Sequence, residues 1–272
     1  MKIARYYQPE GGRWAIVKGT FLLPIGFQGS IHDLVANPLD VGPLGDPVPV
    51  EDIRFAPPLS QYSKIIAIGL NYLDHVQESK GKIPEVPIVF SKFTNSLIGH
   101  GGQITWGKDI TGKVDFEAEL AVVIGKEVCR CEETEAADAI LGYTCANDVS
   151  ARDLQFGDGQ WVRGKSLDTF CPLGPWLVTP DEIPDPNNLS IRCWLNGKLM
   201  QDSNTGRMIF KVPYLISFLS RHFTLFPGDL ILTGTPHGVG AFRDPPVYLN
   251  DGDEIVVEIE GIGRLANTCR VR

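Results

Sequence analysis

The sequence lacks the features of a membrane, secreted or nucleic-acid-binding protein. It has no apolar run approaching the roughly 20 residues of a membrane-spanning helix, and its first residues lead into a polar stretch without a signal-peptide core. Basic residues are in deficit, 25 against 33 acidic ones, and the net charge of −8 disfavours nucleic acids and anionic membranes as partners. We therefore expect a cytoplasmic protein that binds neither.

Paired cysteines are absent as well. The six cysteines are scattered, form no Cys-x-x-Cys pair and have mostly apolar neighbours, so we expect reduced thiols rather than disulfides or a zinc site. What the chain does have is apolar content, 43% of 272 residues at a mean hydropathy of −0.02. That content predicts a sizeable core, in one large domain or in one large and one small domain.

The chain is expected to divide near residue 57. Strand-like pieces at 3–7, 13–18 and 20–23 are separated by glycine and proline, and residues 37–47 are so rich in both that they are typical of a linker. We therefore predict a small β-rich N-terminal domain with its linker over residues 1–57. A main catalytic domain is predicted over residues 58–272.

The most informative stretch is an acidic strand over residues 114–125. Its β-branched and apolar residues predict a strand, and because side chains alternate along a strand, Glu117 and Glu119 point the same way. Asp148 follows a second apolar run and supplies a third carboxylate. Three oxygen ligands without Cys or His favour Mg²⁺, Mn²⁺ or Ca²⁺ over zinc. From spacing alone, the two glutamates fit the solvated face of an edge strand equally well.

A histidine–carboxylate pair follows the first strand of the main domain. Residues 64–69 predict a buried strand that breaks at glycine, and if residues 73–78 are helical, His75 and Glu78 share one face. A carboxylate beside an imidazole orients it and supports its protonated form, which suits a general base. An exposed histidine with a nearby glutamate is the alternative. The polar loop 79–87, rich in Gly and Pro, is a candidate flap over a pocket.

Residues 159–166, GQWVRGKS, satisfy the phosphate-binding loop pattern G-x-x-x-x-G-K-[ST]. That pattern needs a hydrophobic strand before it and a helix after it. Residues 153–158 are too polar for such a strand, and the prolines at 172 and 175 disfavour the helix. We therefore do not expect nucleotide binding here, and we interpret Lys165 as a candidate cation beside a metal-bound anion.

The last third of the chain is mostly β. An alternating run with Asn196-Gly197 predicts a hairpin over 189–198, residues 229–236 and 253–259 predict strands, and 209–223 has helical periodicity. Residues 131–141 read as a helix with acidic residues in its first turn and Gly142 at its end. The sequence as a whole predicts a mixed α+β fold with more β than α structure.

Several segments resemble, in order, the motifs of the fumarylacetoacetate hydrolase family. They are GLNYLDHVQE (69–78), DFEAEL (115–120), NDVSARDLQ (147–155), GKSLD (164–168) and LTGTP (232–236). The resemblance implies a β-sandwich roll, a homodimer, a bound Mg²⁺ or similar ion, and a small 2-oxo acid substrate with a further carbonyl group. The first 57 residues resemble only the variable extension of that family.

The resemblance also implies a role for each motif residue. Glu117, Glu119 and Asp148 would be the metal ligands, His75 and Glu78 the water-activating dyad, and Lys165 the cation that stabilises an enolate. Arg152, Gln155 and Thr235 would line the substrate pocket. The leading interpretation is a metal-dependent hydrolase that cleaves a C–C bond in an acylpyruvate-like 2,4-dioxo acid. An oxaloacetate decarboxylase, an isomerase or a hydratase on the same scaffold is the nearest alternative, and a non-catalytic metal- or nucleotide-binding protein is the other.

Overall fold

The computed structural model describes every residue except 10, 28, 30, 37–41, 43 and 59–63. Its strands are β1 (Lys2–Gln8), β2 (Gly11–Lys18), β3 (Phe21–Pro24), β4 (Val48–Pro49), β5 (Phe55–Ala56), β6 (Ile65–Gly69), β7 (Ile88–Lys92), β8 (Leu97–Ile98), β9 (Gln103–Trp106), β10 (Val114–Asp115), β11 (Ala118–Ile124), β12 (Ile140–Asn147), β13 (Ser150–Ala151), β14 (Cys171–Val178), β15 (Ser190–Leu195), β16 (Lys198–Asn204), β17 (Leu230–Leu232), β18 (Glu254–Ile259) and β19 (Gly263–Val271).

Helices are fewer and short. The α-helices are α1 (Ile31–Ala36), α2 (Leu73–Glu78), α3 (Arg152–Gly157), α4 (Val162–Lys165) and α5 (Val212–His222). The 3₁₀ helices are η1 (Val50–Asp52), η2 (Thr94–Ser96), η3 (Glu133–Ala139), η4 (Pro180–Glu182), η5 (Thr205–Arg207) and η6 (Gly240–Phe242). Among the described helices, none is long and apolar enough to cross a bilayer.

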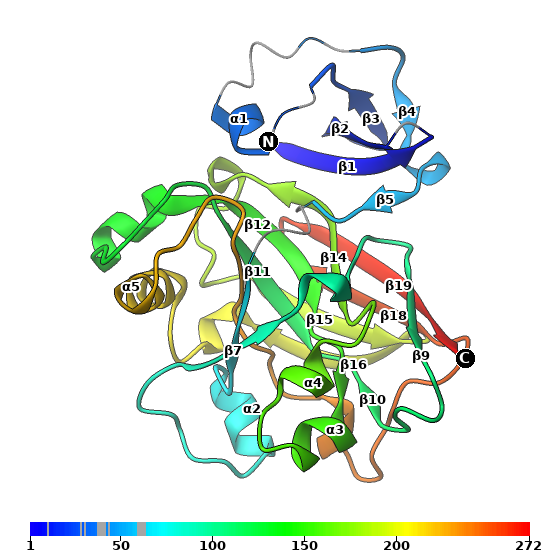
Figure 1. Cartoon of the computed structure of the whole chain (residues 1–272), viewed down its shortest axis with the longest axis vertical. Helices are drawn as coiled ribbons and strands as arrows, with labels where there is room; N and C mark the ends of the chain where they lie inside the picture. The colour runs from blue at the N-terminus through cyan, green and yellow to red at the C-terminus, as the bar shows by residue number, and fades with distance from the viewer. Residues whose placement is uncertain (10, 28, 30, 37–41, 43, 59–63) are drawn as a thin grey trace.

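Two β-sheets pack against each other around the main core (Figure 1). In the described residues, the larger sheet has the order β4-β3-β2-β1-β14-β12-β11-β17-β6-β7, and the smaller has the order β16-β15-β18-β19-β9. One continuous cluster of buried side chains joins Leu120 and Val122 of the larger sheet to Ile191 and Val257 of the smaller one. The predicted mixed, mostly β architecture of a sandwich type is thereby confirmed.

Strand β11 lies in the middle of the larger sheet. It pairs antiparallel with β12 on one side and with β17 on the other, and all seven of its residues are buried. A strand covered on both faces is nearly all apolar, and Ala118–Ile124 has one exception, Glu119. A charged residue in such a place has to be offset by a partner or a ligand, so Glu119 marks a site and not a solvated edge.

The predicted strand over 114–125 is interrupted at Phe116 and Glu117, which separate β10 from β11. Two side chains form hydrogen bonds with the backbone N–H groups of this stretch in place of a neighbouring strand. Asn147 Oδ1 accepts from Glu117 N at 2.9 Å, and Gln201 Oε1 accepts from Ala118 N at 2.9 Å. The prediction of one unbroken strand was wrong because these acceptors come from distant segments. The break nevertheless leaves both glutamates beside each other.

The N-terminal strands form their own layer at one end of the molecule (Figure 1). Strands β1, β2 and β3 confirm the three predicted strand pieces, and they surround a small separate cluster that includes Tyr6, Leu22 and Phe55. These strands are the end of the larger sheet, to which they are connected through β1, which pairs with β14 at Lys2↔Val178. The predicted linker 37–47 lies largely outside the described residues, and the division between residues 57 and 58 remains our proposal.

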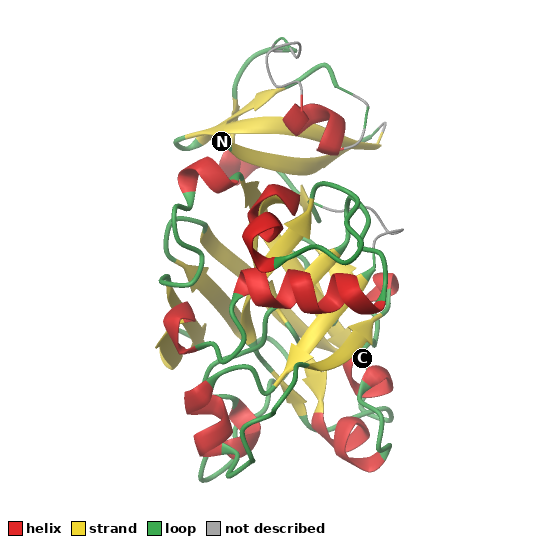
Figure 2. Cartoon of the chain, turned by 90° about the vertical axis from the view of Figure 1, so that its left-hand side faces the viewer, coloured by secondary structure: helices red, strands yellow, loops and turns green. Residues whose placement is uncertain are grey.

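The remaining predictions for the last third are mostly confirmed. Strands β15 and β16 form the predicted hairpin, with positive φ at Asn196 and Gly197. Helix α5 packs the residues Val212, Leu215 and Leu219 into the main core, which the spacing required, and Figure 2 shows it lying across the strands.

The helix predicted over 131–141 was wrong in type and in length. The 3₁₀ helix η3 ends at Ala139, and Gly142 belongs to β12. A Cβ on Gly142 would lie 2.5 Å from Val178 O, so this glycine permits close strand packing and does not end a helix.

Candidate active site

Three carboxylates converge at the end of β11. Glu117 precedes the strand, Glu119 is its second residue, and Asp148 follows the neighbouring strand β12 directly. One oxygen from each lies within 4.8 Å of the others, and all three side chains are buried. Backbone pairing sets the spacing, because Asp148 N donates to Glu117 O at 2.9 Å. The structure therefore brings together the three residues for which the sequence predicted metal binding.

Buried cations surround two of these carboxylates. Lys165 Nζ donates to Glu117 Oε2 at 2.8 Å and to Asp148 Oδ2 at 2.6 Å, while Lys92 Nζ donates to Asp148 Oδ1 at 2.6 Å. Burial acts to lower the pKa of Lys165, but the charges of Asp148 and Glu117 outweigh it and raise that pKa. Lys165 is therefore charged and already bound to Glu117 and Asp148. It does not point to a phosphate, as the lysine of a phosphate-binding loop would.

Glu119 has a different environment. Its Oε2 accepts from Gly234 N at 2.7 Å. In the part of the chain that the structure describes, no lysine, arginine or histidine nitrogen lies within 4.0 Å of it. Burial raises the pKa of Glu119 well above its ordinary value, and the negative charges of Asp148 and Glu117 add to the effect. Glu117 shows the reverse: burial acts to raise its pKa, but Lys165 and Arg152 lower it to about 2.

The donor set fits a divalent cation. Hard oxygen ligands on fixed backbone suit Mg²⁺, Mn²⁺ or Ca²⁺, and burial together with the charges of Asp148 and Glu117 raises the pKa of Glu119. A divalent ion held by Glu117, Glu119 and Asp148 would supply a positive charge to Glu119 in place of a proton.

The raised pKa of Glu119 predicts the pH dependence of stability in the metal-free protein. Above the ordinary value of 4.5 the unfolded chain releases this proton while the folded chain keeps it, so the free energy of unfolding falls as pH rises. Glu117 titrates below this window. We expect the melting temperature in EDTA to fall as pH rises above the ordinary value of 4.5, and Glu119→Gln to reduce that fall. Equal slopes for the two proteins would contradict the assignment.

The predicted dyad is formed on α2. His75 Nδ1 lies 2.8 Å from Glu78 Oε1, and Glu78 Oε2 accepts from Gly238 N at 2.8 Å. His75 is 6% exposed, and its ring lies against that of Phe242. The imidazole is one of the groups that lower the pKa of Glu117, which places it within electrostatic reach of the carboxylates. The structure thus rules out an exposed histidine with a chance neighbour.

The three residues predicted to line the substrate pocket lie around the carboxylates. Arg152 starts α3 and contacts Glu117 Oε1 at 2.7 Å, and its Nη1 donates to Gln155 Oε1 at 2.9 Å. Thr235 follows Gly234, the residue that donates to Glu119, but its own hydrogen bond comes from Gln201 Nε2 at 2.8 Å. Their predicted contact with substrate stays a prediction.

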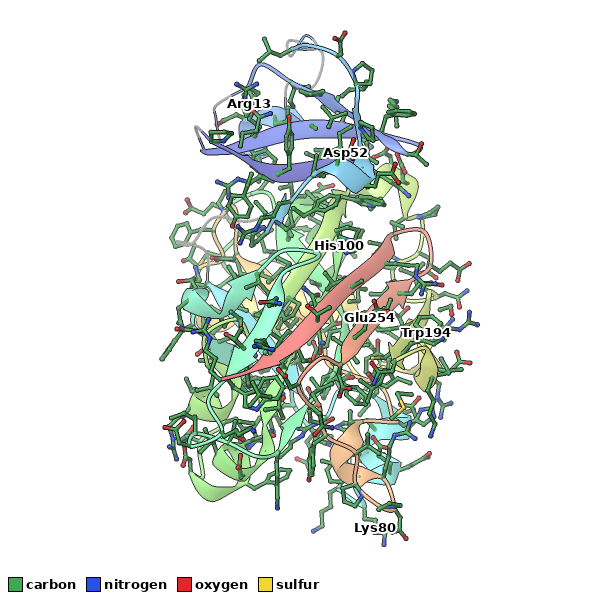
Figure 3. All side chains as sticks on the ribbon, turned by 90° about the vertical axis from the view of Figure 1, so that its right-hand side faces the viewer. Arg13, Asp52, Lys80, His100, Trp194 and Glu254 are labelled. Carbon is green, nitrogen blue, oxygen red and sulfur yellow. The ribbon has the colours of Figure 1, made fainter. Side chains whose placement is uncertain are left out.

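Sequence reasoning missed Lys92 and Asp115. Lys92 ends the apolar strand β7 with its side chain fully buried, and a lysine at the end of such a strand is no signal by itself. Asp115 is fully buried and accepts from Arg152 Nε at 2.8 Å. It precedes Glu117 and Glu119 at the same two-residue spacing, a pattern that pointed to one shared face. The predicted flap 79–87 is an irregular loop after α2, and Lys80 lies at the end of the molecule far from the N-terminal layer (Figure 3).

This geometry agrees with the comparisons to known proteins. Residues 64–270 match the family model described as fumarylacetoacetate (FAA) hydrolase C-terminal, so the chain belongs to the fumarylacetoacetate hydrolase family and is an enzyme of that family.

A relative from Rattus norvegicus, named "Oxaloacetate tautomerase Fahd2a, mitochondrial", is 48% identical over 221 residues, covering 81% of this chain and 70% of the rat protein. Two similar solved structures cover the whole chain: fumarylacetoacetate hydrolase from Exiguobacterium antarcticum, with 36% identity, full coverage of that chain and a TM-score of 0.87, and 2-hydroxyhepta-2,4-diene-1,7-dioate isomerase from Mycobacterium marinum, with 36% identity, 99% coverage of that chain and a TM-score of 0.83.

Proposed function

We propose that this chain is a divalent-metal-dependent enzyme that moves a proton on a small 2-oxo dicarboxylic acid, with the keto–enol tautomerisation of oxaloacetate as its first candidate reaction. The observation that carries the proposal is a buried cluster of three carboxylates within electrostatic reach of a histidine–glutamate dyad. The rat relative at 48% identity, named as an oxaloacetate tautomerase, supports this choice of substrate.

Glu117, Glu119 and Asp148 would hold the ion, with Mg²⁺ or Mn²⁺ as the first candidates and Ca²⁺ as a further one. Bound there, a divalent cation would orient the adjacent keto and carboxylate oxygens of a 2-oxo acid and stabilise negative charge on the keto oxygen. Lys165 holds a second positive charge beside Glu117 and Asp148. A fixed cation of this kind stabilises an enolate without reorganising during the reaction.

The dyad provides the proton transfer. Glu78 Oε1 accepts a hydrogen bond from the protonated Nδ1 of His75, so Nε2 is the ring nitrogen that is free to act as the base. Nε2 removes a proton from the carbon next to the keto group, the C–H electron pair becomes the new C=C bond, and the keto oxygen takes the negative charge. Returning the proton to carbon or placing one on oxygen gives the keto or the enol form. No water takes part in this step.

Hydrolysis of an acylpyruvate is the second candidate. The same His75 Nε2 can remove a proton from water, which then attacks the distal carbonyl and breaks the neighbouring C–C bond. The observation in its favour is likeness along the whole chain to the fumarylacetoacetate hydrolase structure from Exiguobacterium antarcticum. A decarboxylase or another isomerase needs the same carboxylates and Lys165, and a fold by itself does not choose among these reactions.

A substrate screen tests the proposal. With Mg²⁺ or Mn²⁺ present, we expect the protein to accelerate the ketonisation of enol-oxaloacetate, which is measured as the loss of enol absorbance. EDTA should stop this acceleration. Pyruvate release from acetylpyruvate, fumarylpyruvate and oxaloacetate is measured in parallel. Acceleration of the enol step without pyruvate release supports the tautomerase. Pyruvate release from an acylpyruvate without any effect on the enol would favour the hydrolase.

The wider setting of the enzyme also remains a proposal. We propose a homodimer, as the family resemblance implied, and a small 2-oxo acid as the ligand. The cytoplasmic location expected from the sequence stays a prediction, and the rat relative carries the word mitochondrial in its name. Size-exclusion chromatography with light scattering measures the oligomeric state.

A further inference from the structure

The loop 238–242 contacts both members of the dyad. Its first residue, Gly238, donates N–H to Glu78 Oε2 at 2.8 Å. Its last residue, Phe242, packs its ring against that of His75 with centroids 5.8 Å apart. The loop comes from a segment more than 150 residues beyond α2 in the chain. The orientation of the imidazole therefore depends on where this loop is held.

A single carboxylate, that of Asp115, holds the middle of the loop. Its Oδ1 accepts from Gly240 N at 2.7 Å, and its Oδ2 accepts from Ala241 N at 2.9 Å. Asp115 is fully buried, and the remaining contact of Oδ2 is with the guanidinium of Arg152, whose Nε donates at 2.8 Å. Both oxygens thus face N–H donors, and no orientation of a neutral amide would satisfy them all.

The backbone of loop 238–242 approaches Asp115 closely because residues 238 and 240 are both glycine. A Cβ on Gly240 would lie 1.8 Å from Val247 O and 2.6 Å from Asp115 Oδ1. Gly238 has φ +96°, and a Cβ there would lie 2.3 Å from Met200 O. Only glycine tolerates either position. The loop therefore packs closely against Asp115, Val247 and Met200, which leaves it little freedom to shift.

Arg152 connects this arrangement to the carboxylate cluster. Its Nη2 lies 2.8 Å from Asp115 Oδ2 and 2.7 Å from Glu117 Oε1. One unbroken series of contacts consequently runs from Glu117 through Arg152 and Asp115 to the loop, and from the loop to Glu78 and His75. The two halves of the site, one on β11 and the other on α2, are placed relative to each other by these contacts.

We propose that Asp115 is a positioning residue: by holding loop 238–242, it sets the place of the His75 ring relative to the carboxylate cluster. It acts through the loop and touches neither the substrate nor the ion. The inference rests on the proposed function to the extent that His75 is taken as the base. A misplacement of about 1 Å in such a group costs on the order of 100-fold in rate.

Asp115→Asn tests the proposal in a double-mutant cycle with His75→Ala. We expect kcat to fall about tenfold to 100-fold, with KM and Mn²⁺ affinity close to those of the parent, and with no further loss when His75 is already alanine. The matched control is Asp153→Asn, since Asp153 accepts from Gly112 N and Leu154 N but contacts no part of the dyad loop. An undiminished kcat, or the same fold loss in the His75→Ala background, would overturn the proposal.

A second variant tests the loop without changing Asp115, in case Asp115→Asn does not fold. An NMR measurement on His75 needs no substrate and so does not depend on the proposed reaction. Ala241→Pro removes one of the two loop donors, at the second residue of η6, and should reproduce part of the effect. In metal-free protein labelled with ¹⁵N-histidine, both variants should shift the ring resonances of His75, identified by their loss in His75→Ala, while Asp153→Asn should not. Unshifted resonances would reject the positioning role. Full turnover by His75→Ala would instead reject His75 as the base.

Discussion

Glu119→Gln is expected to abolish divalent-metal binding and to lower the metal-dependent activity by more than about 100-fold, the upper loss typical of changes just outside a ligand shell. Glutamine keeps the size of the side chain and one carbonyl oxygen but removes the charge. In the described structure Glu119 is the carboxylate of the three that has no cation within 4.0 Å. Its charge is therefore available to a metal ion and not needed by a protein group.

The same variant should be at least as stable as the parent when both are metal-free at neutral pH. Glutamine is neutral without taking up a proton, so the cost of keeping Glu119 protonated in the folded chain disappears, and no buried cation is left unpaired. Asp148→Asn differs, because it leaves Lys92 and Lys165 without their shared carboxylate, and breaking a buried pair costs about 3–5 kcal/mol. Glu119 is thus the position at which loss of activity can be separated from loss of fold.

Calorimetric titration with Mn²⁺ and thermal unfolding in EDTA measure the two effects. Glu258→Gln is the matched control, since Glu258 lies in another strand, β18, and pairs with Arg264 at the surface. It should leave metal affinity and activity unchanged. Near-normal turnover and unchanged Mn²⁺ affinity in a folded Glu119→Gln protein would remove the metal assignment and the proposed function with it.

Local patterns predicted the parts of the site that neighbours in sequence define. The spacing of Glu117 and Glu119 and the helical spacing of His75 and Glu78 predicted that each pair shares a face, because a strand and a helix fix the relative direction of such pairs, but spacing alone left solvent-exposed alternatives open. Asp148 as a third carboxylate and Lys165 as a candidate cation were also taken from the sequence itself, and the motif resemblance then gave each of them a specific role. The structure places all of these residues around one cluster.

The failures all involve groups from distant segments. Residues 116 and 117 leave the strand because the side chains of Asn147 and Gln201 take over backbone donors. Gly142 belongs to a strand because Val178 approaches it from β14. Asp115 was not assigned a role because its partners are N–H groups of residues 240 and 241. Such contacts follow from tertiary packing, and the composition or periodicity of a single short stretch of sequence does not predict them.

The two candidate reactions share His75 as their base and differ in whether it takes a proton from carbon or from water. A general base typically contributes about 10²–10⁴-fold, so His75→Ala should reduce the enzymatic ketonisation of enol-oxaloacetate by that factor. Glu78→Gln should cost less, because Glu78 orients the ring through Nδ1 and is not itself the base. The matched control is His222→Ala on α5, an exposed histidine whose Nδ1 lies 2.8 Å from Phe218 O.

Binding should survive the loss of His75 and thereby separate chemistry from recognition. Oxalate has two adjacent carboxylates but no enolisable carbon, so it would bind as a 2-oxo acid does and not react. We expect its Mn²⁺-dependent affinity to be the same in the parent and in His75→Ala, because the imidazole is not among the three carboxylates that form the cluster. A joint loss of oxalate binding and activity would show that His75 supports the site and does not serve as its base.

Incorporation of hydrogen from solvent into the product distinguishes the two proposed roles of His75, which are proton transfer at carbon and activation of water. If His75 Nε2 transfers the proton to and from carbon, the parent enzyme in D₂O should introduce deuterium at the carbon next to the keto group faster than the uncatalysed reaction does, and His75→Ala should lose this exchange together with ketonisation. If His75 instead activates water, it should be needed for cleavage of an acylpyruvate while exchange at that carbon stays at the uncatalysed rate. That second pattern would replace the tautomerase by the hydrolase, because the dyad would then deprotonate water and not substrate.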